Sequence, residues 1–388
     1  MGAGAMANLK TDVLVIGGGL AGAATAYYLA REGVEVTLVE RLDLNTQASG
    51  SNAGSLHLQI PYPEFISEGE DWARGFTQAT PVMRESIRLW RGLEAELGCD
   101  LEVSIDGGLL VAETEDEMRA IARKAAIERA AGLEIELVSS ADVRGIAPYL
   151  SERMIGAAYC RDEGKANPLK ATPAFAAAAR RLGARILANC EVTALSPDGG
   201  GYRAETGAGP MKAARVVNAA GADAGRISAM LGVDLPIEGH PIQVTVTEQA
   251  EPVVKHLVYF AGGKLTLKQA KNGSFLIGGG WSARRSTRAD RPAVDPQSLL
   301  SNLRVARHVV PRLNSTCLLR VWPAIVNGTA DWKPILGELP GRPGVFMSMF
   351  PWMGFTAGPM SALLTAELVL GRKPRLDIGA FSAARYMP

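Results

Sequence analysis

The chain has 388 residues, more than one small hydrophobic core usually organises, so we expect two domains or one large α/β domain with an insertion. Its 41 basic and 40 acidic side chains give a net charge of +1, which provides no electrostatic footprint for nucleic acid or an anionic membrane. The 4 cysteines lack C-x-x-C spacing and the 4 histidines form no H-E-x-x-H pair. We therefore expect no metal site and no nucleic-acid partner.

An apolar run from Val13 to Ala30 is long enough to raise the question of a transmembrane helix. Its glycines, and its order of branched aliphatic residues followed by a turn, instead predict a soluble βα unit. We therefore expect no transmembrane segment and a cytoplasmic protein.

The segment "TDVLVIGGGLAGAATAYYLAREGVEVTLVE" predicts a strand, a glycine turn, a helix and a second strand. Residues 13–16 form a short apolar run that is typical of a strand buried on both faces. Residues 23–31 are good helix formers, and Gly33 is a natural helix stop.

The turn in this segment has the spacing G-x-G-x-x-G, formed by Gly17, Gly19 and Gly22. The first glycine permits a tight turn, the second lets the backbone approach a pyrophosphate, and the third lets helix and strand pack closely. The helix amides and dipole then face the phosphates. Glu40 ends the second strand, where a carboxylate can accept both ribose hydroxyls. An acid there favours NAD or FAD over NADP.

The next segment, "NTQASGSNAGSLHLQIPY", distinguishes between these two cofactors. It is rich in small and hydrogen-bonding residues, and it follows Glu40 at the place where the chain would continue towards an isoalloxazine ring. A nicotinamide enzyme would normally enter another crossover helix directly. The segment therefore predicts FAD.

With "ASGSNAGS" added to the glycine motif and Glu40, the sequence resembles the D-amino-acid oxidase superfamily of FAD-dependent oxidoreductases. That superfamily includes glycine and sarcosine oxidases and the D-amino-acid and proline dehydrogenases. Later segments fit it in motif order: "ANCEVTAL", "ARVVNAAGADAGRIS", "RVWPAIVNGTADWKPILG" and "FPWMGFTAGPMSALLTAELVLG". The resemblance covers nearly the whole chain.

The resemblance implies an α/β fold in which a Rossmann-like FAD-binding domain is interleaved with an antiparallel-sheet substrate domain. The FAD-binding domain would comprise residues 9–90, 146–235 and 324–388, and the substrate domain residues 91–145 and 236–323. The resemblance also implies a set of FAD contacts within the shared motifs. These are Gly17, Gly19, Leu20, Ala21, Gly22, Glu40, Arg41, Ser49, Asn52, Ala53, Gly54, Ser55, Leu56, Val192, Gly221, Gly354, Phe355 and Thr356.

Local patterns agree with the second domain. Thr114 and Glu117 form a capping box between two apolar runs, and "HPIQVTVTE", "KLTLKQ" and "SFLIGGG" alternate like antiparallel strands. Asn167 before Pro168 predicts a capped helix.

Two charged clamps of the best-known relatives are missing. Glycine-oxidase-like members have an arginine four residues after the tryptophan that corresponds to Trp322, and this position is Val326. Sarcosine-oxidase-like members have a lysine two residues after the glycine that corresponds to Gly354, and this position is Thr356. Because an unpaired buried carboxylate is costly, we expect the substrate to be held differently from glycine or sarcosine.

Replacement contacts must come from other residues. His57 and Gln59 alternate along an extended segment and can face one cavity, although a structural role for His57 stays open. Tyr259 and Lys268 are further candidates that could equally belong to a sheet surface, and Trp352 is a candidate pocket wall or core residue.

The motif "RVWPAIVNGTADWKPILG" raises the question of a catalytic arginine. We expect Arg320, Trp322, Asp331 and Pro334 to form a scaffold that shapes the flavin-facing loop, with Arg320 in a structural pair.

The segments "SNAGSLHLQ", "LTLKQ" and "GFTAGP" most resemble the flavin subunits of opine oxidases, hydroxyproline and proline dehydrogenases and hydrogen-cyanide synthase. This resemblance implies oxidation of the C–N bond of a secondary or N-substituted amino acid, an opine, a proline-like or a D-amino acid. Hydride would pass to flavin N5, and the imine would be hydrolysed. Partner subunits are implied by the resemblance alone.

Two alternatives stay open. One is an FAD-dependent 2-hydroxy-acid oxidoreductase with His57 as the base that takes the hydroxyl proton. The other is a non-catalytic or electron-relay flavin subunit of a heteromeric complex.

Overall fold

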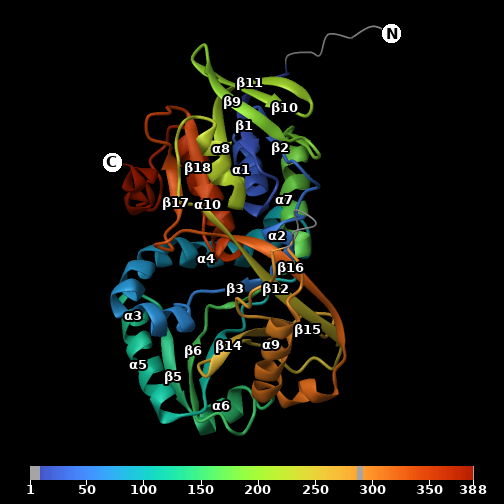
Figure 1. Ribbon diagram of the computed structural model, residues 1–388, viewed down its shortest axis with the longest axis vertical. Coiled ribbons are helices and arrows are strands. Elements are labelled where there is room, and N and C mark those ends of the chain that lie inside the picture. The colour runs from blue at the N-terminus through green and yellow to red at the C-terminus, as the bar shows by residue number, and fades with distance from the viewer. Residues whose placement is uncertain (1–8, 286–291, 388) are drawn as a thin grey trace.

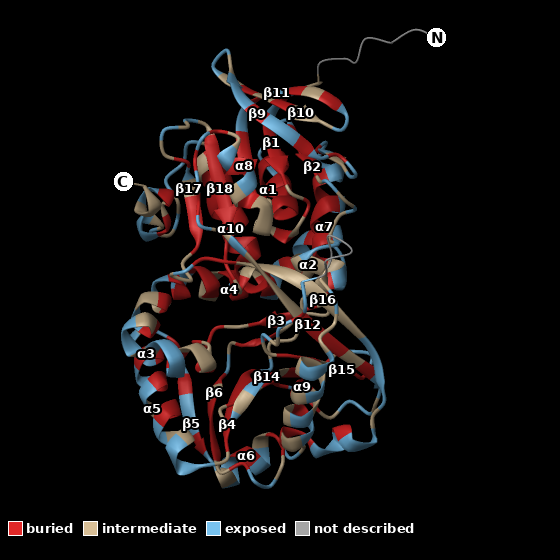
Figure 2. Ribbon diagram, in the orientation of Figure 1, coloured by how far each residue is buried: buried red, intermediate tan, exposed pale blue. Residues whose placement is uncertain are grey.

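The chain folds around two eight-stranded sheets, which lie one above the other in Figure 1. The computed structural model describes residues 9–285 and 292–387. Figure 2 shows that the buried residues concentrate in the strands of both sheets and in the helices packed against them. The fold is α/β, as the sequence predicts.

The upper sheet has the strand order β17-β18-β11-β1-β2-β8, with the hairpin β9-β10 attached to β11. Strands β18, β11, β1, β2 and β8 are parallel to one another, whereas β17 is antiparallel to β18. The strands are β1 Leu9–Ile16, β2 Val36–Val39, β8 Arg185–Leu187, β9 Val192–Asp198, β10 Gly201–Thr206, β11 Gly209–Asn218, β17 Ile335–Glu338 and β18 Val345–Met349.

Helix α1 (Leu20–Arg31) follows the glycine turn and is almost completely enclosed by α7 (Pro168–Arg181) and α10 (Gly354–Val369). Ala23, Ala24 and Ala26 let these neighbours approach closely, because their side chains are small and fully buried. The predicted strand, turn and helix are confirmed, with the helix starting three residues earlier than residue 23. Helix α8 (Ala224–Ala229) packs on β11.

The lower sheet has the order β16-β12-β15-β14-β13-β4-β6-β5. It is antiparallel as predicted, except that β4 and β13 pair in parallel. Its strands are β4 Gly108–Ala112, β5 Ile135–Ser139, β6 Gly156–Cys160, β12 Glu238–Gln249, β13 Leu257–Phe260, β14 Gly263–Gln269, β15 Ser274–Gly278 and β16 Leu318–Gly328.

Helices α5 (Glu115–Ala130) and α7 begin where the sequence predicts. The capping box of α5 is present, since the amide of Glu117 donates to Thr114 Oγ1 and the amide of Thr114 donates to Glu117 Oε2. Asn167 caps α7 through the amide of Leu169. The other elements are α2 Ala48–Ser51, β3 Ser55–Leu56, α3 Tyr62–Phe76, η1 Thr77–Ala79, α4 Thr80–Leu97, α6 Ser140–Ile146, β7 Gly164–Lys165, η2 Gly221–Asp223, α9 Pro296–Val309, η3 Pro311–Ser315, η4 Gly379–Phe381 and η5 Ala383–Tyr386.

The division into domains stays a proposal, with two changes. Strand β16 pairs with β12 as far as Gly328, so residues 324–328 belong with the lower sheet and not with the FAD-binding domain. Strand β6 lies within the range 146–235 that we expected in the FAD-binding domain, but it pairs with β4 and β5 of the lower sheet. Because both of its hydrogen-bonded neighbours are there, we move that boundary to a position after Cys160.

Within the described ranges, none of the helices is both long and apolar enough to cross a membrane.

Candidate active site and cofactor site

The turn after β1 has no room for side chains. Gly17 has φ +112°, and a Cβ added there would lie 2.4 Å from the carbonyl oxygen of Ala219. A Cβ on Gly22 would lie 1.9 Å from the carbonyl oxygen of Gly17. Both positions therefore require glycine, which is what the dinucleotide motif predicts.

Two polar side chains organise the start of α1. Ser49 Oγ accepts a hydrogen bond of 2.9 Å from the amide of Leu20. The Glu40 carboxylate accepts from the amides of Gly18 (2.6 Å) and Leu42 (2.9 Å). Glu40 thus lies beside the glycine turn, at the carboxyl edge of the parallel strands where nucleotides bind in such sheets.

A cavity of about 340 Å³ opens at this edge, between the glycine turn and the start of α10. Gly22 lies beneath the turn and does not line it. Of the FAD contacts expected from the sequence, those on its wall are Gly17, Gly19, Leu20, Ala21, Glu40, Arg41, Ser49, Asn52, Val192, Gly221, Gly354 and Phe355.

The residues of this cavity fit an extended polar cofactor. Asn45 Oδ1, Ser348 Oγ, Trp352 Nε1 and Ser361 Oγ all line it, are buried, and lack a hydrogen-bond partner in the part of the chain that the structure describes. Buried polar atoms almost always have hydrogen-bond partners, so these four atoms indicate a ligand whose polar groups supply the missing partners. Gly221, with φ +58°, leaves open space where a Cβ would stand and permits close approach of that ligand.

The remaining expected contacts, Ala53 to Leu56 and Thr356, join the strand β3 to the start of α10. Thr356 Oγ1 accepts from the amide of His57 (2.8 Å) and donates to the carbonyl of Ser55 (3.4 Å). The indole of Trp90 donates to the carbonyl of Thr356 at 3.0 Å. These bonds fix the segment that carries His57 against the helix that begins at the cavity.

Lys268 on β14 is buried and donates to Ser55 Oγ at 2.5 Å. No carboxylate pairs with it among the described residues. Burial, reinforced by the charge of Lys165, lowers the pKa of Lys268 to about 7. Lys268 lines a second cavity, of about 1190 Å³, which adjoins the first because both are lined by Asn52 and by residues 45–47.

His57 and Tyr259 meet in the interior. The distance from His57 Nδ1 to the Tyr259 hydroxyl is 2.6 Å, and Tyr259 donates to Glu163 Oε1 at 3.1 Å. Both side chains are only partly buried, and neither lines either of the two cavities. Burial, reinforced by the charge of Lys268, lowers the pKa of His57 to about 3, so its imidazole is neutral.

Glu163 is fully buried and surrounded by donors. Besides Tyr259, its carboxylate accepts from the amides of Leu58 (2.6 Å) and Gln59 (2.8 Å) and from Gln59 Nε2 (2.9 Å). Burial nevertheless raises the pKa of Glu163. The carboxylate lies against Gly108, where a Cβ would stand 1.9 Å from Oε2.

A buried ion pair on α5 continues this network. Lys124 Nζ lies 2.5 Å from Glu128 Oε1 and donates to Gln59 Oε1 at 3.3 Å. The expectation that Gln59 faces one cavity with His57 is wrong: neither residue lines either cavity, and Gln59 is buried with Glu163 and Lys124 holding both ends of its amide. Gln59 supports the network behind His57.

An aromatic wall borders the first cavity near α10. Trp352 stacks on Trp332 with ring centroids 4.8 Å apart, and His240 lies over Trp352 at 4.6 Å. Trp72 packs edge-on against Trp332. Val326, the position of the missing arginine, lines the same cavity as Trp352 and pairs with His240 across β12 and β16. This side of the cavity is therefore apolar and aromatic.

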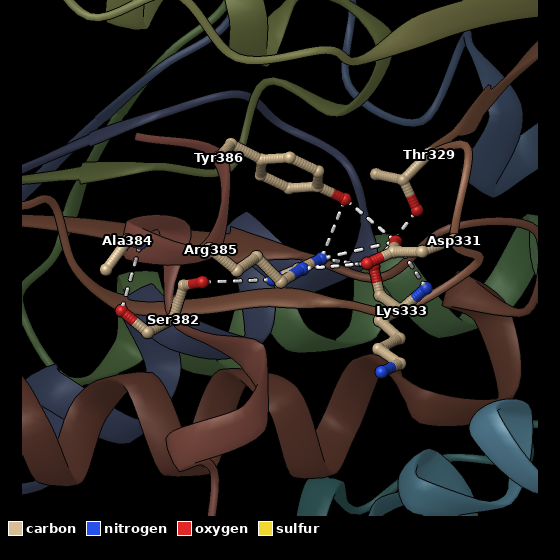
Figure 3. A network of polar contacts seen from close by, with 7 residues as sticks. All are labelled: Thr329, Asp331, Lys333, Ser382, Ala384, Arg385 and Tyr386. Atoms are coloured by element: carbon tan, nitrogen blue, oxygen red, sulfur yellow. Dashed lines mark hydrogen bonds and ion pairs between the residues drawn. The ribbon is translucent and has the colours of Figure 1, made fainter. Parts of the chain in front are cut away.

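The loop that carries Trp332 is fastened to the end of the described chain, as Figure 3 shows. Asp331 accepts from Arg385 Nε (2.9 Å) and from the Tyr386 hydroxyl (2.8 Å), and Arg385 also donates to the carbonyl of Lys333. Burial alone would raise the pKa of Asp331, but the hydrogen bonds from Arg385 and Tyr386 hold it below its usual value. We name Asp331, Arg385 and Tyr386 the C-terminal clasp.

The expected structural pair of Arg320 is wrong. Arg320 is exposed on β16 and lines the second cavity, and no ion pair to it occurs within the described ranges. The aspartate of its motif pairs with Arg385. Trp322 does act as a scaffold, since its indole donates to the carbonyl of Ser51 at 2.8 Å.

A profile of the DAO family, described as FAD dependent oxidoreductase, matches residues 12–368. The chain belongs to this family. As a DAO-family enzyme it is an FAD-dependent oxidoreductase, and FAD is its cofactor.

Curated relatives of the DAO-family chain share about a quarter of its sequence over nearly its whole length. The beta chain of the sarcosine oxidase of Rhizobium meliloti (strain 1021) is 28% identical, with 97% of this chain and 88% of the relative covered. Two further relatives are each 28% identical: glycine oxidase of Geobacillus kaustophilus (strain HTA426) and a subunit of the opine oxidase of Agrobacterium tumefaciens (strain Ach5). In both cases 97% of this chain and 98% of the relative are covered.

Solved structures agree. Glycine oxidase from Geobacillus kaustophilus superimposes with a TM-score of 0.85 at 25% identity, covering 98% of this chain and 100% of the other. L-proline dehydrogenase from P. horikoshii also gives 0.85 at 25% identity, with 98% of each chain covered. The fold alone is shared with L-alpha-glycerophosphate oxidase from Mycoplasma pneumoniae with FAD bound, at a TM-score of 0.77 and 20% identity over 93% and 95% of the two chains.

Sequence reasoning missed several residues of the DAO-family site. Glu163 stands in "RDEGKAN", which has no recognisable motif, and Lys124 and Glu128 have the i, i+4 spacing of an exposed helix pair. His240 lies in "HPIQVTVTE" and Trp332 in "RVWPAIVNGTADWKPILG", but neither pattern marked these two residues as part of a site. The one sequence signal near this buried polar network was the alternation of the polar residues His57 and Gln59. Among the described residues, no group of histidine, cysteine, aspartate and glutamate could hold a metal ion.

Proposed function

We propose that this enzyme oxidises the C–N bond of a secondary or N-substituted amino acid, such as a proline-like imino acid or an opine. The observation that carries the proposal is a neutral, partly accessible His57 fixed by Tyr259, combined with an apolar wall at Val326 and Trp352 in the first cavity. A neutral imidazole can accept a proton from a substrate amine, and an apolar wall accommodates a substituent on nitrogen or a ring.

The cofactor site assigns a task to each group of residues. FAD, when bound, supplies the hydride acceptor. The glycine turn and Glu40 would hold its adenosine diphosphate half, and the four unpartnered atoms Asn45 Oδ1, Ser348 Oγ, Trp352 Nε1 and Ser361 Oγ would meet polar groups along its length.

The protein's own residues orient the substrate and exclude water. His57 is fixed by Thr356 through its backbone and by Tyr259 through its ring, so its position does not depend on the substrate. Trp352, with Trp332 stacked against it, closes the apolar side. The relatives named for sarcosine, glycine, opines and L-proline support a C–N substrate, and the absence of arginine at Val326 disfavours unsubstituted glycine.

A visible spectrum followed by anaerobic titration tests this proposal. We expect flavin absorbance, and bleaching by L-proline, hydroxyproline, an opine or sarcosine more readily than by glycine. A colourless protein that binds no added FAD would overturn the cofactor assignment. Bleaching by none of the amino acids would overturn the C–N assignment, and peroxide release in air would identify an oxidase.

A 2-hydroxy acid is the second candidate, because the same neutral His57 could take a hydroxyl proton. Bleaching by lactate or another 2-hydroxy acid, with no response to amines, would select it.

We also propose that the chain works with partner subunits. Two of the relatives, from a sarcosine oxidase and from an opine oxidase, are themselves named as subunits. If a partner carries the electrons onwards, the isolated chain should be bleached by substrate in air and regain its colour slowly. Rapid reoxidation by oxygen, with full turnover, would contradict a need for a partner.

A further inference from the structure

The bonds around Tyr259 determine where the protons lie. Glu163 Oε1 already receives two backbone amides, and a carboxylate only accepts, so the Tyr259 hydroxyl proton points to Glu163. The Tyr259 oxygen is then free to accept, and the 2.6 Å contact with His57 must be donated by Nδ1–H. His57 is therefore the Nδ1–H tautomer, and its lone pair is on Nε2.

Nε2 of His57 is available to a ligand. It has no hydrogen-bond partner among the described residues, and it is not among their buried unpartnered atoms, so it keeps accessible surface. The arrangement resembles a catalytic base that is oriented by a carboxylate: His57 is the base, Glu163 is the carboxylate, and Tyr259 lies between them.

The interior behind Tyr259 can take up one proton. Glu163, Glu128 and Lys124 are all fully buried, and they comprise two carboxylates and one ammonium group. The cluster carries a net negative charge unless one carboxylate is protonated, and burial disfavours that charge. Glu128 Oε2 is buried and lacks a partner in the described part of the chain, so the cluster has an unused proton site in addition to Glu163.

Other charged groups face this relay. Lys268 on β14 acts on His57, and Lys165 in turn acts on Lys268. Tyr259 on β13 and the thiol of Cys160 on β6 lie beside Glu163, and Lys124 on α5 faces it across Gln59. Lys268 disfavours a proton on His57, and Lys124 disfavours one on Glu163, but burial raises the pKa of Glu163 overall. Because the pKa of His57 is lowered and that of Glu163 is raised, a proton that reaches His57 is favoured to move on to Glu163.

We propose that Glu163 is the acceptor of the proton that the substrate loses, delivered through His57 and Tyr259. This inference rests on the proposed function, since it requires a substrate with an ionisable N–H or O–H group. It makes Glu163 and Tyr259 positioning and relay residues, and His57 the residue that touches the substrate.

The step balances without any change in oxidation state. The substrate N–H bond breaks as His57 Nε2–H forms, His57 Nδ1–H breaks as a Tyr259 O–H bond forms, and the original Tyr259 O–H breaks as Glu163 O–H forms. The substrate goes from ammonium to neutral amine, and Glu163 goes from carboxylate to carboxylic acid. The later removal of hydride is the separate redox step that FAD supports.

The tautomer of His57 is the first test, and it needs no substrate. The holoenzyme labelled with ¹⁵N-histidine has only 4 histidines, and His57→Gln identifies the signal of interest. We expect the Nδ1–H form, uncharged from about pH 5 to about pH 9. Tyr259→Phe removes the acceptor of Nδ1–H and should shift the ring towards Nε2–H.

The chain offers a matched control in a second tyrosine and histidine pair. Tyr149 OH lies 2.8 Å from His256 Nδ1, so Tyr149→Phe should change the His256 signal and leave His57 unchanged. A wild-type His57 in the Nε2–H form, or one that Tyr259→Phe leaves unaltered, would overturn the relay whatever the substrate proves to be.

The second test is the pH dependence of anaerobic flavin reduction by L-proline and sarcosine. Glu163→Gln should slow reduction about 10- to 100-fold near pH 7, and the loss should shrink as the pH rises, because free amine then enters already deprotonated. A merely structural Glu163 would lower the rate by the same factor at every pH, and that result would overturn the proposal. Glu113→Gln, which alters the carboxylate paired with His308, is the control.

Failure of the proposed function gives a different result. If neither amines nor 2-hydroxy acids bleach the flavin, the assigned reaction is wrong, while the histidine signals still decide whether the relay exists. If Glu163→Gln does not fold, Tyr259→Phe keeps the ring volume and provides the same pH comparison.

Discussion

Trp332 and Trp352 stack at 4.8 Å between ring centroids, and each has a backbone φ of +57°. Bulky residues rarely occupy this left-handed region, which costs of the order of 1–3 kcal/mol unless the surroundings impose it. Each tryptophan is held by a backbone bond: the amide of Trp352 donates to the carbonyl of Asn327, and the amide of Trp332 to that of Thr329. One strained residue, Trp352, thus lines the first cavity, and a second, Trp332, stacks against it from behind.

The C-terminal clasp should determine how firmly this wall is held. Arg385→Met removes the donors to Asp331 and to the carbonyl of Lys333, so we expect a loss of roughly 1–3 kcal/mol in the free energy of unfolding. We also expect a weaker near-ultraviolet circular dichroism signal from the stacked tryptophans. Arg372→Met breaks an exposed ion pair with Glu32 and is the control, with little effect expected. Equal effects of both substitutions would contradict a role of the clasp.

Lys268 should destabilise the fold in a pH-dependent way. Its pKa falls from 10.5 to about 7, so between these values the unfolded state binds more protons than the folded state, and stability rises with pH. The shift corresponds to an upper limit on the order of 4–5 kcal/mol. Lys268→Met should therefore raise the melting temperature at pH 7, with the gain declining towards pH 10.

The control for that measurement is Lys264→Met, since Lys264 is exposed on the same strand. It should leave the melting temperature unchanged at both pH values. A Lys268→Met protein that is less stable than the wild type at pH 7 would mean that the ammonium group has a partner worth more than its burial costs.

Gly22→Ala should abolish FAD binding. The new methyl group would lie 1.9 Å from the carbonyl oxygen of Gly17, so the turn must move away from the position that the cofactor requires. The ratio of flavin to protein absorbance measures this loss. Gly145→Ala, at a helical position with open space and ordinary φ, should retain full FAD content. Normal flavin content in Gly22→Ala would place the cofactor elsewhere.

FAD should protect one thiol from labelling. Cys99 and Cys317 are exposed, Cys160 is buried away from both cavities, and Cys190 is buried but lines the first cavity. A thiol reagent should therefore label two cysteines in the holoenzyme and a third after FAD is removed, with Cys190→Ser losing that third site. Identical labelling before and after removal would contradict the cofactor's position over Cys190.

The sequence predicted the parts of this protein that local rules determine. The glycine turn, the Thr114 and Glu117 capping box and the Asn167 cap depend on residues a few positions apart, and the structure has all three. It did not predict the surroundings of Glu163, because its donors come from residues 58, 59 and 259, and their approach depends on the packing of the lower sheet.

Helical spacing was misleading for Lys124 and Glu128. An i, i+4 pair of opposite charges is usually exposed, whereas here α3 and the lower sheet cover it completely. Arg320 shows the opposite error, since we expected this motif arginine in a structural pair and it is exposed. The aspartate of the same motif, Asp331, pairs instead with Arg385, which lies 54 residues later in the sequence.

The strand order of the upper sheet affects the timing of folding. Strand β1 needs β11 beside it, β11 needs β18, and α1 is enclosed only when α10 arrives, so segments from both ends of the chain must meet. During synthesis the FAD-binding turn is made among the first residues, but its sheet and its covering helix are completed among the last. Such long-range pairings make folding slow and leave β1 exposed in the nascent chain. Supplying FAD before synthesis ends should therefore do little for yield, whereas chaperones that shield the early strands should help.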